Sequence, residues 1–504
     1  MITAPEPSGR VVIVGGGIAG LAAALFLRGR AAEVIVLEGA PRLGGKLAVS
    51  EVGGIAVDAG AEALLARRPE AVDLVTEVGL AGHLVYPGTT AASIWSRGEL
   101  RPLPRRQYMG VPGDFDDLER TGIVSPEGMA RARQDAALPA TAWDGDVSVA
   151  EFVGARFGPE VVDRLVEPLL GGVYAGRPDL LSARATLGSV VAAAGAHASL
   201  ARAVASLLGP APDPAVPPAP RPPVFTTLDG GLGSLPGPLA AASGAVIRTG
   251  ATVRELARTA TGWRLTVGPA SAPEAIDADA VILALPARPA GRLLASVPGA
   301  APAATALAEI EYASMGVVTL AYPASAFASV PDGSGYLVPA VDGRTVKAAT
   351  YSTVKWPHLT DGAMHVVRCS VGRFGEEAVL QRDDADLVAL AAAELSEATG
   401  VSGVPVDARV TRWGGGLPQY TVGHLDRVRR IRETVAVLPG LAVCGAAYDG
   451  IGVPACVGTA RLAADQVSAW LGEHRVGEHR VGEHRAGEHR AGEREPGTVA
   501  HAGE

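Results

Sequence analysis

The sequence predicts an α/β protein with a Rossmann-like nucleotide-binding core, to which a mixed α/β domain and a helical subdomain are added. Near the N-terminus, an apolar strand (residues 11–14) precedes a glycine-rich turn, a helix (18–27) and a second apolar strand (34–37). This is the order of a nucleotide-binding βαβ unit. Residues 126–208 have mostly helical spacing. Residues 287–435 alternate strand patterns (316–322, 347–352, 365–371) with helical ones (301–308, 384–399), as expected of a mixed domain.

The turn after the first strand has the pattern G-x-G-x-x-G, formed by Gly15, Gly17 and Gly20. In such a turn the first glycine permits the sharp bend, the second lets the backbone approach a pyrophosphate, and the third lets helix and strand pack closely. The N-terminus of the following helix presents free N–H groups to phosphates. Glu38 ends the second strand, where a carboxylate can accept hydrogen bonds from ribose hydroxyls. The residues expected to bind a dinucleotide are therefore Gly15, Gly16, Gly17, Ile18, Ala19, Gly20 and Glu38.

Directly after this acid, Arg42, Gly44 and Gly45 form an R-x-G-G run. It resembles the second motif of the two-dinucleotide-binding-domain flavoproteins, in which it marks FAD rather than NAD; the alternative is an ordinary glycine-rich turn. Residues 441–466 carry another strand–turn–helix pattern. We expect N–H groups at Gly452 and Val453 to face the pyrimidine edge of a flavin, where negative charge develops on reduction.

The composition excludes several other classes of protein. The net charge of −9 over 504 residues argues against general nucleic-acid binding. The three cysteines lack C-x-x-C spacing, so neither a metal site nor a disulfide framework is indicated, and a reducing cytoplasm fits. The first ten residues contain no apolar signal region. An Ala-rich stretch at 187–209 is interrupted by His197 and Arg202; we expect a buried or surface helix there rather than a membrane contact.

Several further segments carry a resemblance to a known family. These are VDAGAEALLARRPEAVDLVTEVGL (57–80), YMGVP (108–112), EPLLGGVYAG (167–176), LSARAT (181–186) and VTRWGGGLPQYTVGH (410–424). Together they resemble the flavin-dependent protoporphyrinogen and coproporphyrinogen III oxidases of the Gram-positive type, within the FAD-containing amine oxidase superfamily. The run at 167–176 is the most specific to that family. The resemblance also implies that Val253 flanks the adenine.

The resemblance implies an enzyme of haem biosynthesis that oxidises a porphyrinogen to a porphyrin. Six electrons would leave in three two-electron steps to FAD, which O₂ reoxidises with release of H₂O₂. Because the flavin carries this chemistry, we expect no nucleophile and no metal, and we name no catalytic residue. The next enzyme of the pathway is a candidate for transient contact. Alternatives are an amine oxidase, which needs an aromatic cage, a carotenoid desaturase, and a flavin-binding scaffold without activity.

Arginines cluster in two loops of this acidic chain. Arg67 and Arg68 lie in one, and residues 96–106 (SRGELRPLPRR) hold four arginines against a single acid, Glu99. One interpretation is a solvated basic surface; the other is a set of cations that binds substrate carboxylates. On the second interpretation we expect Arg67, Arg68, Arg101 and Arg105 to bind substrate. Such a set favours coproporphyrinogen III, with four propionates, over protoporphyrinogen IX, with two.

The chain is expected to divide into interleaved segments. FAD-binding parts are predicted at 9–85, 224–286 and 436–471, and substrate-domain parts at 86–110 and 287–435. The helical subdomain is predicted at 111–208, and 209–223 is a Pro-rich linker. Residues 472–504 begin with G-E-H-R-V/A repeats; because they lack aromatic residues and have a period of five, we expect them to be disordered.

Overall fold

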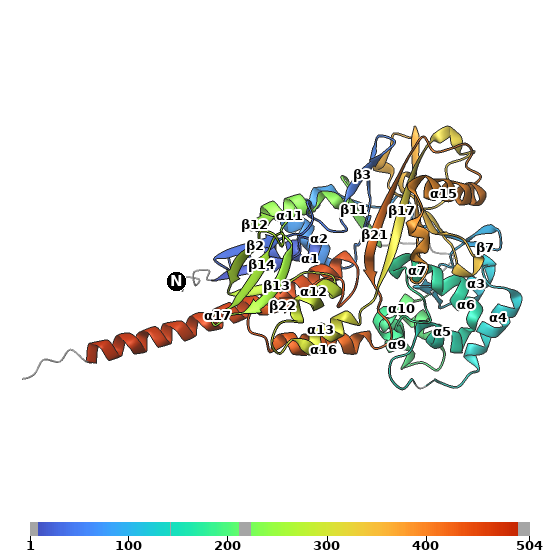
Figure 1. Ribbon diagram of the computed structural model, residues 1–504. Helices are drawn as coiled ribbons and strands as arrows, with labels where there is room; N and C mark the ends of the chain where they lie inside the picture. Colours follow the sequence, from blue (N-terminus) through green and yellow to red (C-terminus); the bar gives the residue numbers. More distant parts are fainter. Residues whose placement is uncertain (1–8, 142, 211–222, 492–504) are drawn as a thin grey trace, which may run out of the picture.

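A five-stranded parallel sheet forms the nucleotide-binding unit of the computed structural model, which describes residues 9–141, 143–210 and 223–491 (Figure 1). Its strand order is β12 (Val246–Arg248), β2 (Glu33–Leu37), β1 (Arg10–Val14), β16 (Ala280–Leu283) and β22 (Leu441–Val443), and neighbouring strands are parallel. Val11 and Ile13 pack on one face of the sheet, whereas Val12 and Val14 pack on the other. Both faces are buried, which is why residues 11–14 are all apolar, whereas Arg10 at the start of the strand is exposed. This sheet confirms the predicted fold class.

Different elements pack on the two faces of this sheet, the first face being that of Val11 and the second that of Val12. The first packs against α1 (Ile18–Phe26), α2 (Pro69–Glu77), α11 (Pro236–Ser243) and the first turns of α17 (Val453–Ala491). The second packs against β13 (Val253–Arg258), β14 (Trp263–Val267), β15 (Glu274–Ala278), α12 (Ala287–Leu294), α13 (Ala301–Ala308) and α16 (His424–Ala436). Helices α12, α13 and most of α16 lie in the range 287–435 that the sequence predicts for the substrate domain. Their apolar faces nevertheless pack on the nucleotide-binding unit.

Residues 246–258 fold as two strands that belong to two different sheets. β12 pairs with β2 in the parallel sheet, and β13 pairs with β14 in an antiparallel one. Gly250 lies between them with φ of +66°, a conformation that favours glycine and turns the chain from one sheet to the other.

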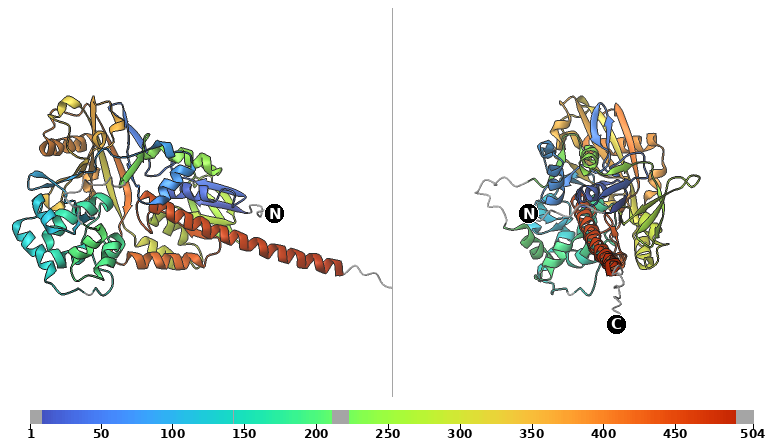
Figure 2. Two further views of the ribbon diagram at one scale, coloured as in Figure 1. Left: turned by 180° about the vertical axis from the view of Figure 1, so that it is seen from behind. Right: turned by 90° about the vertical axis from the view of Figure 1, so that its left-hand side faces the viewer.

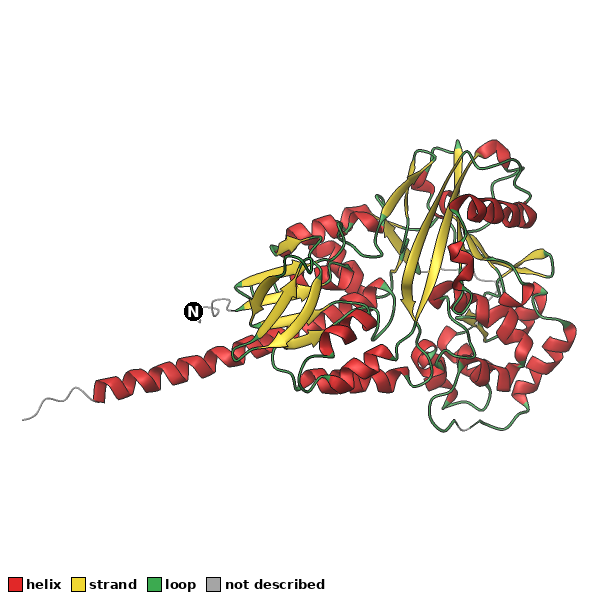
Figure 3. Cartoon of the chain, viewed as in Figure 1, coloured by secondary structure: helices red, strands yellow, loops and turns green. Residues whose placement is uncertain are grey.

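A seven-stranded sheet forms the second unit (Figure 3). Its strand order is β21 (Asp407–Pro418), β17 (Tyr312–Pro323), β20 (Met364–Val371), β19 (Val346–Tyr351), β18 (Gly335–Leu337), β7 (Ser93–Ser96) and β8 (Glu99–Pro102). Its outer face packs against α15 (Asp384–Thr399) through residues such as Cys369 and Ala349. The alternate residues of the same strands, such as Arg368 and Thr350, therefore lie on the inner face.

Short elements join the two units. The hairpin β3 (Val49–Val52) and β4 (Ile55–Asp58) packs on β17 and β20 through a small apolar cluster that includes Ala321 and Val366. β11 (Phe225–Leu228) pairs with both β5 (Leu64–Leu65) and β6 (Leu84–Val85). α14 (Ser352–Lys355) follows β19. The chain thus crosses repeatedly between the nucleotide-binding unit and the second sheet.

The helical subdomain has its own core, built from the short hairpin β9 (Gln107–Tyr108) and β10 (Val111–Pro112) and eight helices among the described residues. These are α3 (Phe115–Thr121), α4 (Pro126–Arg133), α5 (Val149–Phe157), α6 (Pro159–Val161), α7 (Glu167–Tyr174), α8 (Ala183–Thr186), α9 (Gly188–Ala194) and α10 (Leu200–Leu208). The Pro-rich linker at 209–223 lies almost wholly outside the described residues. Across 9–141, 143–210 and 223–491, no helix combines the length and apolar character needed to span a membrane.

The C-terminal repeats differ from the expectation. Helix α17 continues through Ala491, so residues 472–491 are helical rather than disordered, and only 492–504 lie outside the described part. The left view of Figure 2 shows this helix extending away from the rest of the molecule. The physical reason is that its first turns are anchored in the core as far as Leu471, so the repeats extend an existing helix and need no costly nucleation.

Candidate functional site

The residues predicted to bind a cofactor meet at one edge of the parallel sheet. Parallel strands all end at the same edge, and ligands of doubly wound sheets bind there. A Cβ on Gly15, after β1, would lie 2.4 Å from the carbonyl oxygen of Ala284, after β16. The Gly44 amide donates to the Gly16 carbonyl over 2.8 Å. A Cβ on Gly445, after β22, would lie 4.0 Å from that of Ala19. Four loops distant in sequence thus form one surface.

The three motif glycines have different surroundings. Gly15 has φ of +110°, so the turn itself requires glycine. A Cβ on Gly20 would lie only 1.8 Å from the Gly15 carbonyl oxygen, which shows how closely α1 packs on the turn. Gly17 is different, because no described heavy atom lies within 4 Å of a Cβ built on it. The turn therefore has an open side at Gly17 that fits the phosphates of a dinucleotide.

Glu38 and Arg42 shape the loops on either side of this turn. Each oxygen of the Glu38 carboxylate accepts a backbone N–H over 2.7 Å, one from Gly16 and one from Ala40. The Arg42 guanidinium donates to the carbonyl oxygens of Leu43, Gly45 and Leu47 at 3.1, 2.7 and 3.3 Å. Arg42 thus braces the R-x-G-G loop in this structure, and its contact with a cofactor stays a prediction.

Lys46 is a candidate site residue that the motifs above did not include. It follows Gly45, and its ammonium is close enough to Cys456, in the first turn of α17, to interact with it electrostatically. Burial lowers the pKa of Lys46, yet no hydrogen bond or ion pair to its ammonium exists within the described residues. The signal for Lys46 in the sequence is its position as a basic residue directly after the R-x-G-G run. A cation here fits the diphosphate of FAD.

The remaining predicted cofactor residues border the same edge. Val453 begins α17, and the Gly452 carbonyl accepts the Cys456 amide over 3.1 Å. Val253 begins β13, and its neighbour Thr252 is the residue that a Cβ on Gly39 would touch, at 3.2 Å. The positions predicted for the pyrimidine and adenine ends therefore lie beside β22 and β2 respectively, while their binding of FAD stays a prediction.

A cluster of buried charges joins the nucleotide-binding unit to the second sheet. Glu62 accepts from Lys355 of α14 at 3.1 Å and pairs with Arg368 of β20 at 3.2 Å, and the three side chains are 13%, 17% and 9% exposed. Arg368 also donates to the Gly60 carbonyl over 2.7 Å. Burial alone would raise the pKa of Glu62, but the two cations outweigh it and bring the pKa to about 2.

The segment that carries Glu62 touches both units. The Ala61 amide donates to the Lys46 carbonyl over 3.1 Å, and the Trp413 indole of β21 donates to the Ala59 carbonyl over 3.0 Å. Asp58 accepts the Leu232 and Gly233 amides at 2.9 and 2.8 Å. Residues 58–62 therefore connect the R-x-G-G loop with the inner face of the seven-stranded sheet.

The inner face of that sheet keeps accessible surface in its middle. Ala348 and Thr350 of β19 and Ser370 of β20 are half-buried, whereas outer-face residues on the same strands, such as Ala349 and Cys369, are buried. Central strands covered on both sides would be buried on both. This partly open inner face, between the sheet and the nucleotide-binding unit, is the candidate position for a substrate.

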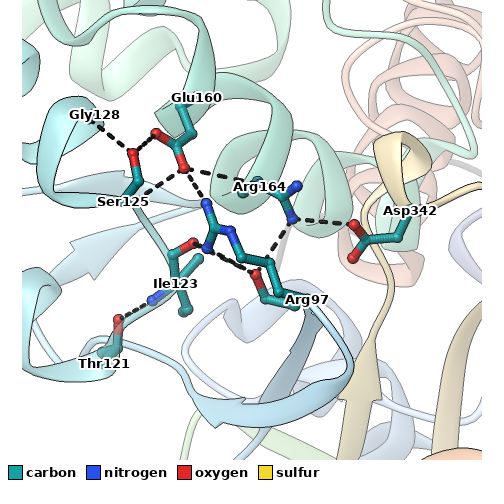
Figure 4. A network of polar contacts seen from close by, with 9 residues as sticks. Arg97, Thr121, Ile123, Ser125, Gly128, Glu160, Arg164 and Asp342 are labelled. Carbon is teal, nitrogen blue, oxygen red and sulfur yellow. Dashed lines mark hydrogen bonds and ion pairs between the residues drawn. The ribbon is translucent and has the colours of Figure 1, made fainter.

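Arg97 belongs to a structural network (Figure 4). It lies at the turn between β7 and β8, donates to the Ile123 carbonyl over 2.8 Å and pairs with Glu160. Ser125 also donates to Glu160, through its hydroxyl at 2.6 Å, and Arg164 pairs with Asp342 at 3.1 Å. The network ties the edge of the second sheet to the helical subdomain, which accounts for one arginine of the basic loop.

Of the four arginines predicted to bind substrate, two form ion pairs with acidic side chains and two do not. Arg68 pairs with Glu70 at 2.5 Å, and Arg101 pairs with Glu99 at 2.9 Å. Arg67 and Arg105 are exposed and have no hydrogen bond or ion pair within the described residues. If substrate carboxylates are bound by these loops, Arg67 and Arg105 are the cations free to do so.

Comparison with known proteins places this geometry in a family. The sequence profile described as "Flavin containing amine oxidoreductase" matches residues 18–468. The coproporphyrinogen III oxidase of Mycobacterium tuberculosis is 41% identical over 90% of this chain and 96% of its own length; that of Bacillus subtilis is 30% identical over 92% and 98%. The crystal structure of a candidate protoporphyrinogen oxidase from Exiguobacterium sp. 255-15 superposes with a TM-score of 0.80 at 30% identity, over 92% of this chain and 100% of that one.

Replacing Gly17 by valine should abolish FAD binding and leave the protein folded. A Cβ at this position has no described heavy atom within 4 Å, and φ at Gly17 is −75°, so we expect any loss of flavin to come from exclusion of the cofactor. Flavin released on denaturation measures the content, and circular dichroism checks the fold. Gly237→Val in α11, where a Cβ also meets nothing within 4 Å, is the matched control. A Gly17→Val protein with full flavin content would refute the site.

Glu62→Gln should lower the free energy of unfolding by about 3 kcal/mol at pH 7, because two buried cations lose their carboxylate. The depressed pKa of Glu62 means that this stabilisation is full above pH 4.5, the ordinary pKa, and is lost as the pH falls through about 2. Denaturant unfolding should therefore show a smaller difference from wild type at pH 3 than at pH 7. Glu70→Gln, which breaks an exposed pair, should cost less than about 1 kcal/mol. Equal stability of Glu62→Gln and wild type at pH 7 would contradict the role of the cluster.

Proposed function

The chain belongs to the flavin containing amine oxidoreductase family, and from this premise we propose that it oxidises coproporphyrinogen III to coproporphyrin III with FAD as its cofactor. The observation that carries the proposal is its near full-length likeness to the mycobacterial coproporphyrinogen III oxidase. The open side at Gly17, the unpaired Lys46 and the partly open inner face of the second sheet support it, since they suit a dinucleotide and a large substrate side by side.

The overall reaction removes six electrons and six protons from the porphyrinogen, and three O₂ become three H₂O₂. FAD, when bound, supplies the acceptor of the hydride equivalents. The protein supplies binding, orientation and electrostatics. Residues 58–62, held by Arg368 and Trp413, set the spacing between the cofactor loops and the sheet. The half-buried Ala348, Thr350 and Ser370 offer small side chains against which a flat macrocycle can lie.

Protoporphyrinogen IX is the second candidate substrate, favoured by the likeness to the Exiguobacterium structure. Carboxylate number separates the two candidates, because two propionates would leave more of the loop cations unpaired than four would. An amine oxidase is disfavoured by Tyr448, the only aromatic residue of the last motif. Its side chain is 1% exposed and lies in the core beneath the nucleotide sheet, so it cannot belong to a substrate cage.

The purified holoprotein should convert coproporphyrinogen III to its fluorescent porphyrin at a rate that depends on O₂. Porphyrin fluorescence measured with each porphyrinogen in turn, in air and under argon, tests this, and H₂O₂ formed per porphyrin should be three. Anaerobic addition of substrate should bleach the flavin absorbance. If neither porphyrinogen bleaches the flavin and an amine does, the proposed function is wrong.

Arg67→Ala and Arg105→Ala should each raise the KM for coproporphyrinogen III by about tenfold and affect protoporphyrinogen IX less. One charge-assisted contact contributes about 1.5 kcal/mol, which is about one decade in affinity. Arg68→Ala and Arg101→Ala are the matched controls, because their guanidinium groups already pair with neighbouring acids. Wild-type kinetics for both test variants would show that these loops are a solvated surface.

A further inference from the structure

Two of the family-specific sequence motifs have no role in the function proposed above, yet they meet in the structure. One is P-Q-Y…G-H at 418–424, and the other is V-Y-A-G at 173–176. The Tyr420 and Tyr174 rings lie 5.6 Å apart, and Gln419 donates to the Tyr174 carbonyl over 2.8 Å. Both motifs thus come together beside residues 445–452, the loop between β22 and α17.

The Tyr420 hydroxyl bridges that loop. It donates to the Ala446 carbonyl over 2.6 Å and accepts the Gly450 amide over 2.9 Å. These two backbone groups are four residues apart, and Gly450 has φ of +141°. This φ lies outside the range of a regular helix or strand, so the hydrogen bonds of both groups come from the Tyr420 side chain. Tyr420 is only 2% exposed, so a single buried hydroxyl links the two ends of the segment 446–450.

His424 holds the same loop at a third point. Its ring is stacked on Tyr420, with centroids 3.8 Å apart and planes 14° from parallel, and its Nε2 lies 3.3 Å from the Tyr448 carbonyl. A carbonyl oxygen only accepts, so Nε2 carries the proton. Burial lowers the pKa of His424 to about 4, which keeps the ring neutral at neutral pH. Ala446, Tyr448 and Gly450 are therefore all held from the segment that follows β21.

We propose that Tyr420 is a positioning residue that fixes residues 445–452 against the flavin and thereby raises the reduction potential of bound FAD. This inference rests on the proposed function, which includes FAD bound at this edge of the sheet. The loop leads into the N-terminus of α17, whose free N–H groups form the positive end of the helix dipole. Fixed donors stabilise negative charge that develops on a ligand better than mobile ones do, so a looser loop would favour the reduced flavin less.

The test is Tyr420→Phe, which removes one oxygen atom and keeps the packing of the ring. We expect its midpoint potential to fall by about 30 mV, which corresponds to a tenfold change in the two-electron equilibrium. We also expect the rate constant of flavin reduction by the porphyrinogen to fall about tenfold, with KM changed by less than about twofold. The potential is measured with redox dyes and no substrate, so this readout survives even if the assigned substrate is wrong.

Tyr448→Phe is the matched control, because the Tyr448 hydroxyl is in the same loop, is equally buried and has no hydrogen-bond partner within the described residues. It should leave the potential and the kinetics at wild-type values. Thermal unfolding of both variants shows whether stability has changed. A Tyr420→Phe protein with wild-type potential would overturn the proposal, and so would an equal shift in Tyr448→Phe.

A purely structural role for Tyr420 would give a different pattern: reduced flavin content or melting temperature, with a wild-type potential in the molecules that retain FAD. That result overturns the proposal too. His424→Gln adds a second measurement, because the amide can still donate to the Tyr448 carbonyl but cannot stack as the imidazole does. It should shift the potential in the same direction as Tyr420→Phe and by less.

Discussion

All loops at the candidate cofactor site meet because the strands of the nucleotide sheet are parallel. Parallel strands β1, β2, β16 and β22 end at one edge, and the loops after them come from four distant parts of the chain. The close contacts Gly15–Ala284 and Gly20–Gly15 leave no room for side chains, so the backbone itself forms the surface. A dinucleotide is suited to such a surface, because its phosphates can bind backbone N–H groups.

The contacts between the second sheet and this core include a small apolar cluster and a buried charge cluster. The apolar part comprises few residues, whereas Glu62 receives two cations from two different elements. A displaced ion pair would leave charges buried without partners. The cluster therefore specifies one arrangement of the cofactor loops relative to the inner face of the sheet, and a redox reaction between two bound molecules depends on that arrangement.

Neighbouring acids partly balance the positive charge of the two arginine-rich loops. Arg68 and Arg101 have acids two residues away that pair with them, and such spacing can be noticed in the sequence. The pairing of Arg97 with Glu160 could not, since the two are 63 residues apart. Of the four candidate arginines, only Arg67 and Arg105 have no hydrogen bond or ion pair within the described residues, and the hypothesis of carboxylate binding depends on such unpaired cations.

Local patterns in the sequence determined the βαβ unit, the glycine turn, the R-x-G-G loop, α13 and α15, because periodicity and turn chemistry act within a few residues. They also determined the family, through short motifs in fixed order. Tertiary structure alone decided that β12 and β13 belong to different sheets, that Glu62 unites Lys355 with Arg368, and that Tyr420 reaches Ala446 and Gly450. Residues 472–491 are helical because they continue a helix whose first half is packed in the core, and not because of their own composition. These features depend on contacts between residues far apart in the chain, which no local pattern records.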